Sequence, residues 1–136
     1  MLSGLHSVLV WSEDVRRLLP FYRDVLGLKP LVEAGEFAVF PLSAGVGLRI
    51  GTHSDVRGPA RDPSRVMVNF RVEDCQAEYE RLTAQGVDFI RAPSPDAIHI
   101  VATFSDPDGN LLQLMQDLVS LLPDLIATIE QEGGAR

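Results

Sequence analysis

The pattern of apolar and polar residues passes through the same series of elements twice. Residues 5–11 alternate as a half-buried strand does, and an apolar stripe of helical period then runs to about residue 26. Short apolar runs between turn residues predict three strands, at 31–33, 37–41 and 47–50. After a loop at 52–64 the order returns, with a strand at 66–72, a helix to residue 86, and strands at 87–91, 98–104 and 111–116. The chain is therefore predicted to be one α+β domain with two βαβββ repeats, at about 5–51 and 66–116.

Capping and breaking residues mark the ends of the first helix. Ser12 is a favourable N-cap, and Glu13 and Asp14 put negative charge in the first turn, where the helix dipole stabilises it. Pro20 lies inside the helical stripe and is expected to bend the helix or split off its first turn. Gly27 ends the helix in the way a C′ glycine does. The second helix is expected to be capped by residue 73 or 74.

The last predicted hairpin contains the strongest turn signal in the chain. Asp106-Pro107-Asp108-Gly109 combines a preset proline φ, an aspartate that bonds its own backbone, and a glycine free to take positive φ. Alternation along 111–116 puts Leu112 and Leu114 on one face of the second strand and Gln113 on the other. Gln113 is therefore predicted to be a polar group on the face that the sheet encloses.

The final segment lies outside the repeats. Residues 117–132 carry apolar positions at helical spacing, with Pro123 interrupting the run. A C-terminal helix over about 117–132 is expected to pack on the sheets or on a second subunit.

Composition excludes several classes of partner. The net charge of −7 argues against a nucleic-acid surface, which needs a basic patch. No apolar run reaches the roughly 20 residues that a membrane span requires. The first residues contain no basic segment followed by an apolar one, so no secretory signal is expected. Cys75 is the only cysteine, which excludes an intrachain disulfide and fits the cytoplasm, where the protein is expected to act.

Several short motifs occur in order along the two repeats. The first repeat contains His6, Ser12-Glu13-Asp14 and Phe21-Tyr22-Arg23-Asp24-Val25-Leu26-Gly27-Leu28. The second contains Val72-Glu73-Asp74, Leu82-Thr83-Ala84-Gln85-Gly86-Val87 and Phe104-Ser105-Asp106-Pro107-Asp108-Gly109-Asn110. Together they resemble the vicinal oxygen chelate superfamily, the glyoxalase/bleomycin-resistance/extradiol-dioxygenase group, over about residues 5–116. The resemblance implies a curved mixed sheet around a cavity, into which metal-dependent members direct up to four His and Glu ligands from first and last strands.

When the four ligand positions of the family are transferred to this sequence one residue at a time, most of them do not carry a suitable metal ligand. His6 matches the first position, but Arg49, Met67 and Gln113 occupy the other three. Arg49 offers no lone pair and repels a cation, and the Met67 thioether is a soft ligand that hard divalent ions avoid. Gln113 offers only an uncharged carbonyl oxygen. We therefore expect neither the family's catalytic metal nor another cofactor, with His6 and Gln113 as weak candidate ligands and a divalent metal as the alternative.

The two remaining histidines offer another route to a metal site. His53 follows Arg49 in a loop, and His99 lies on a strand of the second repeat. A site built from His6, His53 and His99 is conceivable, although no short metal-binding motif supports it. The competing interpretation makes His53 a solvated loop residue and His99 a strand residue bonded to a neighbour.

The face that the sheet encloses resembles a small-molecule pocket, in which a few polar groups interrupt an apolar wall. The residues predicted to line it are His6, Arg49, Met67, Asn69, Arg71 and Gln113. Arg49 replaces the charge of a metal with one fixed in the protein, so the ligand is predicted to present a carboxylate, phosphate or polarised carbonyl to it. The alternative is an internal salt bridge from Arg49 to Glu33 or Glu36. Trp11 and Phe40 are candidates for stacking on a flat ligand or for core packing.

Three functions remain open at this point. The first is a binding protein like the drug-sequestering members of the family, favoured by the lost ligands and opposed by the scarcity of aromatic residues. The second is an enzyme, either a metal-dependent lyase, isomerase or dioxygenase, or a metal-free variant with His6 as general base. The third is a structural or regulatory subunit with an idle cavity. Since relatives are commonly dimers, a homodimer is expected.

Overall fold

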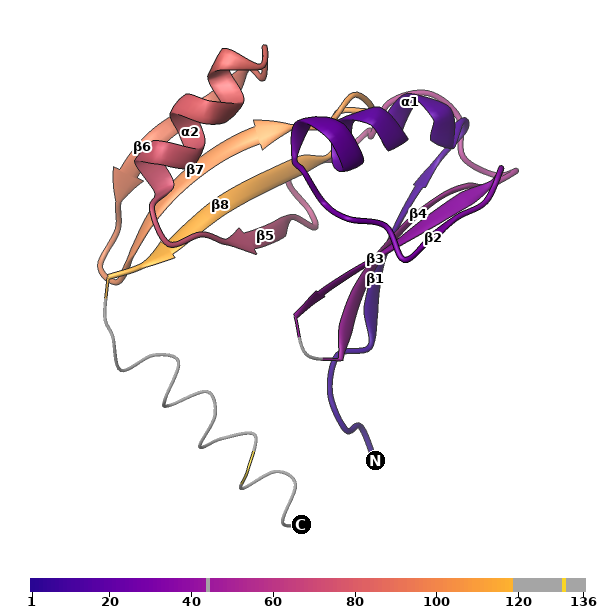
Figure 1. Ribbon diagram of the computed structural model, residues 1–136, viewed down its shortest axis with the longest axis horizontal. Coiled ribbons are helices and arrows are strands. Elements are labelled where there is room, and N and C mark those ends of the chain that lie inside the picture. Colours follow the sequence, from indigo (N-terminus) through magenta and orange to yellow (C-terminus); the bar gives the residue numbers. More distant parts are fainter. Residues whose placement is uncertain (44, 119–130, 132–136) are drawn as a thin grey trace.

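Two βαβββ repeats follow one another in the computed structural model, which describes residues 1–43, 45–118 and 131 (Figure 1). The first repeat consists of β1 Ser7–Ser12, α1 Val15–Pro20, the π-helical turn η1 Phe21–Val25, β2 Val32–Glu33, β3 Phe37–Ser43 and β4 Val46–Thr52. The second consists of β5 Val68–Arg71, α2 Cys75–Ala84, β6 Phe89–Pro95, β7 His99–Ser105 and β8 Leu111–Asp117. The predicted α+β class and the predicted order of elements are confirmed.

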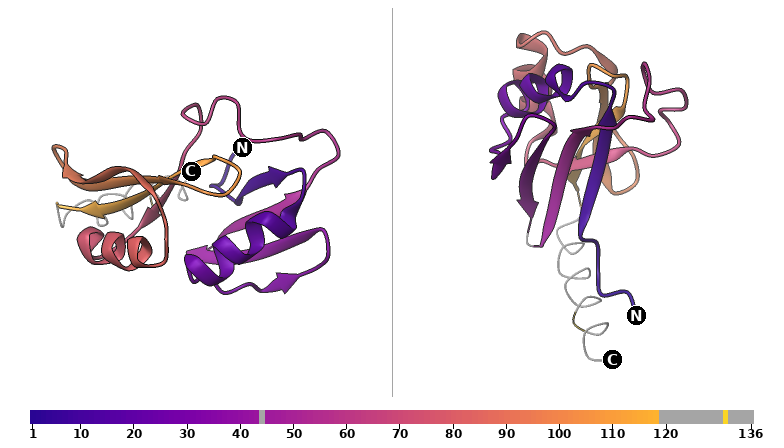
Figure 2. Two further views of the ribbon diagram at one scale, coloured as in Figure 1. Left: turned by 90° about the horizontal axis from the view of Figure 1, so that it is seen from above. Right: turned by 90° about the vertical axis from the view of Figure 1, so that its right-hand side faces the viewer.

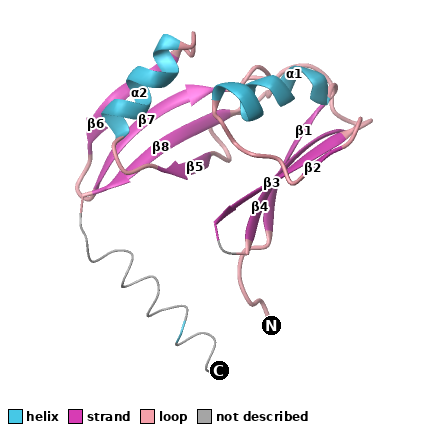
Figure 3. Cartoon of the chain, viewed as in Figure 1, coloured by secondary structure: helices cyan, strands magenta, loops and turns pink. Residues whose placement is uncertain are grey.

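Each repeat folds into its own four-stranded mixed sheet. The strand orders are β1-β4-β3-β2 and β5-β8-β7-β6, so the first strand of each repeat pairs in parallel with the last. The remaining neighbours are antiparallel. Figure 2 shows the two sheets side by side, each with its own helix against one face, and Figure 3 shows the same arrangement of helices and strands. No described helix covers the opposite face of either sheet, which we call its open face.

The first helix starts two residues later than predicted. Asp14, not Ser12, is the N-cap, and its Oδ1 accepts the backbone N–H of Arg16 at 3.0 Å. Ser12 remains in β1 and is buried, with its Oγ accepting the N–H of Asp14 at 3.1 Å. The predicted interruption at Pro20 is confirmed, because α1 ends there and continues as η1. Proline removes one backbone donor from the α-helical ladder, and the chain resumes with a bond from Leu26 N–H to Phe21 O at 2.9 Å.

The strands differ most from the prediction at β6. It runs from Phe89 to Pro95, whereas the sequence pattern ends the strand at residue 91 because prolines follow. β6 is the edge of its sheet and shifts register twice against β7, and an edge strand tolerates proline because its outer N–H groups need no partner. Of the C-terminal helix predicted at 117–132, residues 119–130 and 132 lie outside the described residues. Asp117 itself is the last residue of β8 rather than the start of a helix.

A shared core joins the helix-covered faces of both sheets. Phe21 from η1 meets Phe104 from β7 with 6.3 Å between ring centroids, so the repeats pack through η1. Phe40 is fully buried here, which assigns it to the core and not to a ligand. The fully buried large side chains include Leu18, Tyr22, Phe40, Leu48, Ile50, Leu82, Phe104 and Leu112. None of the described helices is both long enough and apolar enough to cross a membrane.

Candidate functional site

Arg49 lies on the open face of the first sheet, among aromatic side chains. The register pairs Arg49 of β4 with Leu9 of β1 and Val39 of β3, so all three point away from the helix. The guanidinium carbon of Arg49 lies 4.2 Å from the ring centroid of Phe37 and 5.9 Å from that of Trp11. Stacking on a ring face leaves the in-plane N–H groups of a guanidinium directed away from that ring.

Arg49 has no ionic partner within the part of the chain that the structure describes. Its Nε is buried there without a hydrogen-bond acceptor. The alternative salt bridge to Glu33 is not formed, because Glu33 Oε1 instead accepts from the guanidinium of Arg23 at 2.9 Å. No ion pair to Glu36 is present among the described residues either. Arg49 is thus a positively charged side chain with at least one N–H group that no described residue accepts.

His6 does not face the same side as Arg49. It is exposed, precedes β1, and its Nδ1 lies 3.0 Å from Ser7 Oγ. The register pairs Val8 with Leu48, whose side chain is buried on the helix-covered face. His6 lies two residues before Val8, so the alternation of side chains along the strand assigns it to that same face. The prediction that His6 and Arg49 share one wall is wrong, because strand register cannot be read from two separate alternating patterns.

The second-repeat candidates gather on the open face of the other sheet. The register pairs Asn69 of β5 with Gln113 of β8. Gln113 donates its Nε2–H to Thr103 Oγ1 at 2.9 Å, and its carbonyl oxygen has no hydrogen-bond donor among the described residues. Arg71 forms an ion pair with Asp117 at the end of the sheet, and Met67 lies just before β5 with 38% of its surface exposed.

The six predicted residues therefore fall into separate groups within one chain. A groove of about 960 Å³ between the two repeats is lined by Met67, Asn69 and Arg71, with apolar walls that include Val8 and Phe70. His6, Arg49 and Gln113 do not line it. The chain thus brings Arg49 together with Trp11 and Phe37, but leaves Gln113 on a different sheet.

The three histidines lie apart from one another in the described part of the chain. His53 touches Trp11 edge-on, with ring centroids 5.2 Å apart, and its Nδ1 accepts the N–H of Asp55 at 3.1 Å. His99 lies 3.5 Å from both Asp96 and Asp117. In the described residues, no three His, Cys, Asp or Glu side chains converge as metal ligands would. The proposed set of His6, His53 and His99 is not brought together.

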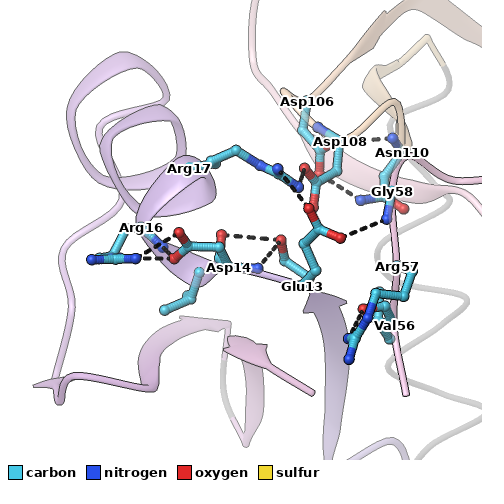
Figure 4. Close-up of polar contacts among 12 residues, drawn as sticks. Glu13, Asp14, Arg16, Arg17, Val56, Arg57, Gly58, Asp106, Asp108 and Asn110 are labelled. Atoms are coloured by element: carbon cyan, nitrogen blue, oxygen red, sulfur yellow. Dashed lines mark hydrogen bonds and ion pairs between the residues drawn. The ribbon is translucent and has the colours of Figure 1, made fainter. Parts of the chain in front are cut away.

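A buried polar cluster connects the two repeats, and sequence analysis missed it (Figure 4). Asp106, 4% exposed, accepts the Tyr22 hydroxyl at 2.7 Å, the backbone N–H groups of Asp108 and Asn110 at 2.9 and 3.0 Å, and the Asn110 side-chain amide at 2.9 Å. Arg17 bridges Asp108 at 2.9 Å and Glu13 at 3.2 Å. The sequence identified the turn at 106–109, but nothing local pointed to Tyr22 and Arg17 as its partners.

The charges in this cluster are set by hydrogen bonding and burial. Burial raises the pKa of the Tyr22 phenol, and the negative charge of Asp106 raises it further, so Tyr22 stays a neutral donor. The backbone N–H of Gly58, with the guanidinium of Arg17, lowers the pKa of Glu13. The hydrogen bond from Tyr22 to Asp106 and the ion pair between Arg17 and Asp108 join the two repeats.

Comparison with known proteins identifies the family to which this chain is similar. The model of the Glyoxalase/Bleomycin resistance protein/Dioxygenase superfamily matches residues 4–114. The metallothiol transferase FosB of Staphylococcus saprophyticus is 26% identical over 117 residues, covering 84% of this chain and 77% of FosB. The uncharacterized protein YetH of Bacillus subtilis is 25% identical over 122 residues, covering 85% of this chain and all of YetH.

Solved structures show the same fold. TnmS3, an antibiotic binding protein from a Streptomyces species, superimposes with a TM-score of 0.70 at 24% identity, covering 85% of this chain and 97% of TnmS3. A member of the same superfamily from Sphaerobacter thermophilus gives a TM-score of 0.67 at 25% identity, covering 85% and 98% of the two chains.

Proposed function

Because the chain belongs to the Glyoxalase/Bleomycin resistance protein/Dioxygenase superfamily, we propose that it binds a small polar or anionic molecule without the metal that catalytic members use. Arg49 takes the place of the metal's positive charge. The ligand presents a carboxylate, phosphate or polarised carbonyl to this guanidinium, and Phe37 and Trp11 pack against its flat part. The residues expected to meet other parts of the ligand are Met67, Asn69, Arg71 and Gln113.

The unpaired state of Arg49 is the observation that supports this proposal. The guanidinium carbon of this arginine lies 4.2 Å from an aromatic ring centroid, its Nε has lost hydration without gaining an acceptor in the described residues, and no described carboxylate pairs with it. A bound anion restores both, because charge-assisted hydrogen bonds to a guanidinium are among the strongest in proteins. The family likeness to an antibiotic binding protein is compatible with sequestration of the ligand, although that likeness concerns the fold.

The Arg49→Met variant is expected to bind an aromatic carboxylate more weakly. With 1-naphthoate as the probe in isothermal titration calorimetry, loss of the charged hydrogen bonds should weaken affinity about tenfold or more. Arg65→Met is the matched control, because Arg65 is exposed on a loop and, among the described residues, forms an ion pair only with Asp62. The neutral analogue 1-naphthalenemethanol should bind the wild type and Arg49→Met equally. Equal affinity of the two proteins for 1-naphthoate would refute the role of Arg49.

A metal-dependent enzyme is the alternative function, as a lyase, isomerase or dioxygenase of the superfamily. The relative FosB is named a metallothiol transferase, which makes metal chemistry a reasonable second candidate for a chain 26% identical to it. Against it stand Arg49 and Met67, neither of which suits a hard divalent cation. A metal site of this kind needs several ligands close together, and the described residues of a single chain do not bring three such side chains together.

We propose further that the functional unit is a homodimer. The open faces that carry Arg49 and Gln113 belong to different sheets, and Leu9 beside Arg49 is 49% exposed. A second chain that places its second-repeat sheet over the first-repeat sheet covers Leu9 and completes one cavity from both groups. Light scattering during gel filtration at micromolar concentration should give twice the chain mass of 14.9 kDa. Elution as a monomer would contradict this assembly.

The cytoplasm is the compartment proposed for this activity. Cys75, the only cysteine, is buried at the start of α2, so the chain depends on no intrachain disulfide. Burial raises the pKa of the Cys75 thiol, with a smaller contribution from Asp74. A thiol kept protonated is a poor nucleophile, so Cys75 is not proposed as one.

A further inference from the structure

In the described part of the chain, the groove between the two repeats opens the hydrophobic core on one side. The groove, of about 960 Å³, reaches core side chains of both repeats, among them Leu48 of β4, Leu82 of α2 and Phe104 of β7. Its rim carries large apolar side chains that are exposed, namely Leu5, Leu42, Val66 and Met67. Continuous apolar surface of this kind marks a site at which another segment or molecule packs.

Charge does not select the occupant of this groove. The charged residues that line it are Lys29, Arg71, Glu73 and Glu78. Arg71 forms an ion pair with Asp117, and Glu78 forms one with Arg81, so neither of them offers a net charge to an occupant. The other two, Lys29 and Glu73, carry opposite charges. The groove therefore favours an apolar occupant over an anion or a cation.

The C-terminal segment, residues 119–132, carries the kind of surface that such a groove accepts. Large apolar residues recur in its sequence at i, i+3, i+4 and i+7, the spacing of one helical face: Leu122, Leu125, Ile126 and Ile129. Gln131, the one residue of the segment that the structure describes, is exposed and falls outside this face. The helix that the sequence predicts over 119–132 would cover about 21 Å, against about 13 Å for the four residues of β5 along the groove. The segment is therefore long enough to follow the groove past β5.

Residue 119 follows a strand that ends beside this groove (Figure 1). Asp117, the last residue of β8, forms an ion pair with Arg71, which lines the groove at the end of β5. The backbone N–H of Leu118 donates to the Ile98 carbonyl oxygen at 2.8 Å, which fixes the point from which the segment departs. A segment attached there reaches the groove of its own chain at the cost of ordering itself, whereas a second copy or a free ligand also loses translational and rotational freedom.

We propose that residues 119–132 dock their apolar face into the groove of their own chain and close the core between the repeats. The segment packs against the side of β5 that carries Val68 and Phe70, and against Leu28 of the first repeat. Alternation along β5 directs Asn69 to the opposite side, where it stays available to a ligand. The inference does not depend on the function proposed for Arg49, because Arg49 does not line the groove.

The test attaches a nitroxide to the rim of the groove in the ¹⁵N-labelled full chain, through the variant Val66→Cys. Val66 is 77% exposed and Cys75 is buried, so the label reacts at the introduced thiol. The amide signals of residues 121–129 should lose most of their intensity through paramagnetic relaxation. Ser54→Cys with the same label is the matched control, because Ser54 is exposed and follows the end of β4 opposite to Val46, which lines the groove. That label should leave the signals of residues 121–129 intact.

Variants of the segment test which of its faces makes the contact. With the label at Val66→Cys, the added pair Leu122→Asn/Ile126→Asn should restore the signals. Without the label, this pair should raise the fluorescence of added 8-anilinonaphthalene-1-sulfonate severalfold, because the groove is uncovered. The control pair Thr128→Asn/Gln131→Asn lies outside the apolar face and should behave as the wild-type segment does.

A mixture of ¹⁵N-labelled wild type with nitroxide-labelled ¹⁴N protein separates contacts within one chain from contacts between two chains. The signals of residues 121–129 should stay intact in this mixture. Their loss there would assign the segment to a second copy and overturn the inference. Full intensity beside the label at Val66→Cys, or equal loss of intensity in the two double variants, would also overturn it.

Discussion

The Asp106→Ala variant is expected to lose about 3 kcal/mol of unfolding free energy, because a buried polar group and its network are broken together. Asp106 is 4% exposed, and its carboxylate accepts from the backbone of the β7–β8 turn and from the hydroxyl of Tyr22 in the other repeat. Its removal leaves the Tyr22 hydroxyl and two backbone N–H groups buried without acceptors. Urea denaturation followed by circular dichroism measures the change.

Two further variants separate the parts of this effect. Tyr22→Phe removes one donor and leaves the turn intact, so it should cost only about 1 kcal/mol. Asp62→Ala is the matched control, because Asp62 is an exposed loop carboxylate with one surface ion pair to Arg65, and it should change stability little. If Asp106→Ala were as stable as Asp62→Ala, the buried contact between the repeats would not be a major source of stability.

The Gly51→Ala variant is expected to lose about 2 kcal/mol, because extra volume in a packed region forces its neighbours to move. A Cβ at residue 51 would lie 2.6 Å from Trp11 Cζ3 and 3.3 Å from the Glu36 carbonyl oxygen. The indole must therefore shift, which also disturbs its contact with Arg49. Chemical denaturation measures the loss, and the emission maximum of Trp11, the only tryptophan, reports the shift of the ring.

Gly47→Ala is the matched control on the same strand. A Cβ there has its nearest neighbour, the Phe40 carbonyl oxygen, at 3.8 Å, which is ordinary contact. It should leave both the stability and the emission of Trp11 close to those of the wild type. Equal behaviour of the Gly47→Ala and Gly51→Ala variants would contradict the packing of Trp11 over Gly51.

Sequence alone predicted the order of elements because its signals are local. Alternation, helical stripes and turn residues identified both repeats, the interruption at Pro20 and the turn at 106–109. The N-cap of the first helix was predicted wrongly because two neighbouring residues can both cap a helix. Asp14 replaced Ser12 as N-cap because the hydroxyl of Thr52, on the neighbouring strand, accepts the first helical N–H at 2.9 Å. The tertiary contact thus determined which of two capping residues is used.

The candidate site was less predictable because it depends on contacts between distant residues. The sequence singled out Arg49, but its stacking on Phe37 depends on the β3–β4 register. Alternation alone could not show that His6 and Arg49 belong to opposite faces. The contact between Tyr22 and Asp106 joins residues 84 positions apart, and no local pattern encodes such a pair.

Elemental analysis by mass spectrometry tests the central claim most directly, on protein purified without chelator and without nickel affinity resin. If Arg49 supplies the positive charge of the site, the protein should carry far less than one equivalent of Zn, Ni, Mn and Fe per chain. A content near one equivalent of any of these metals would contradict metal-free binding. The histidines, with Gln113, would then belong to a metal site completed by a second chain, and the enzyme would become the leading function.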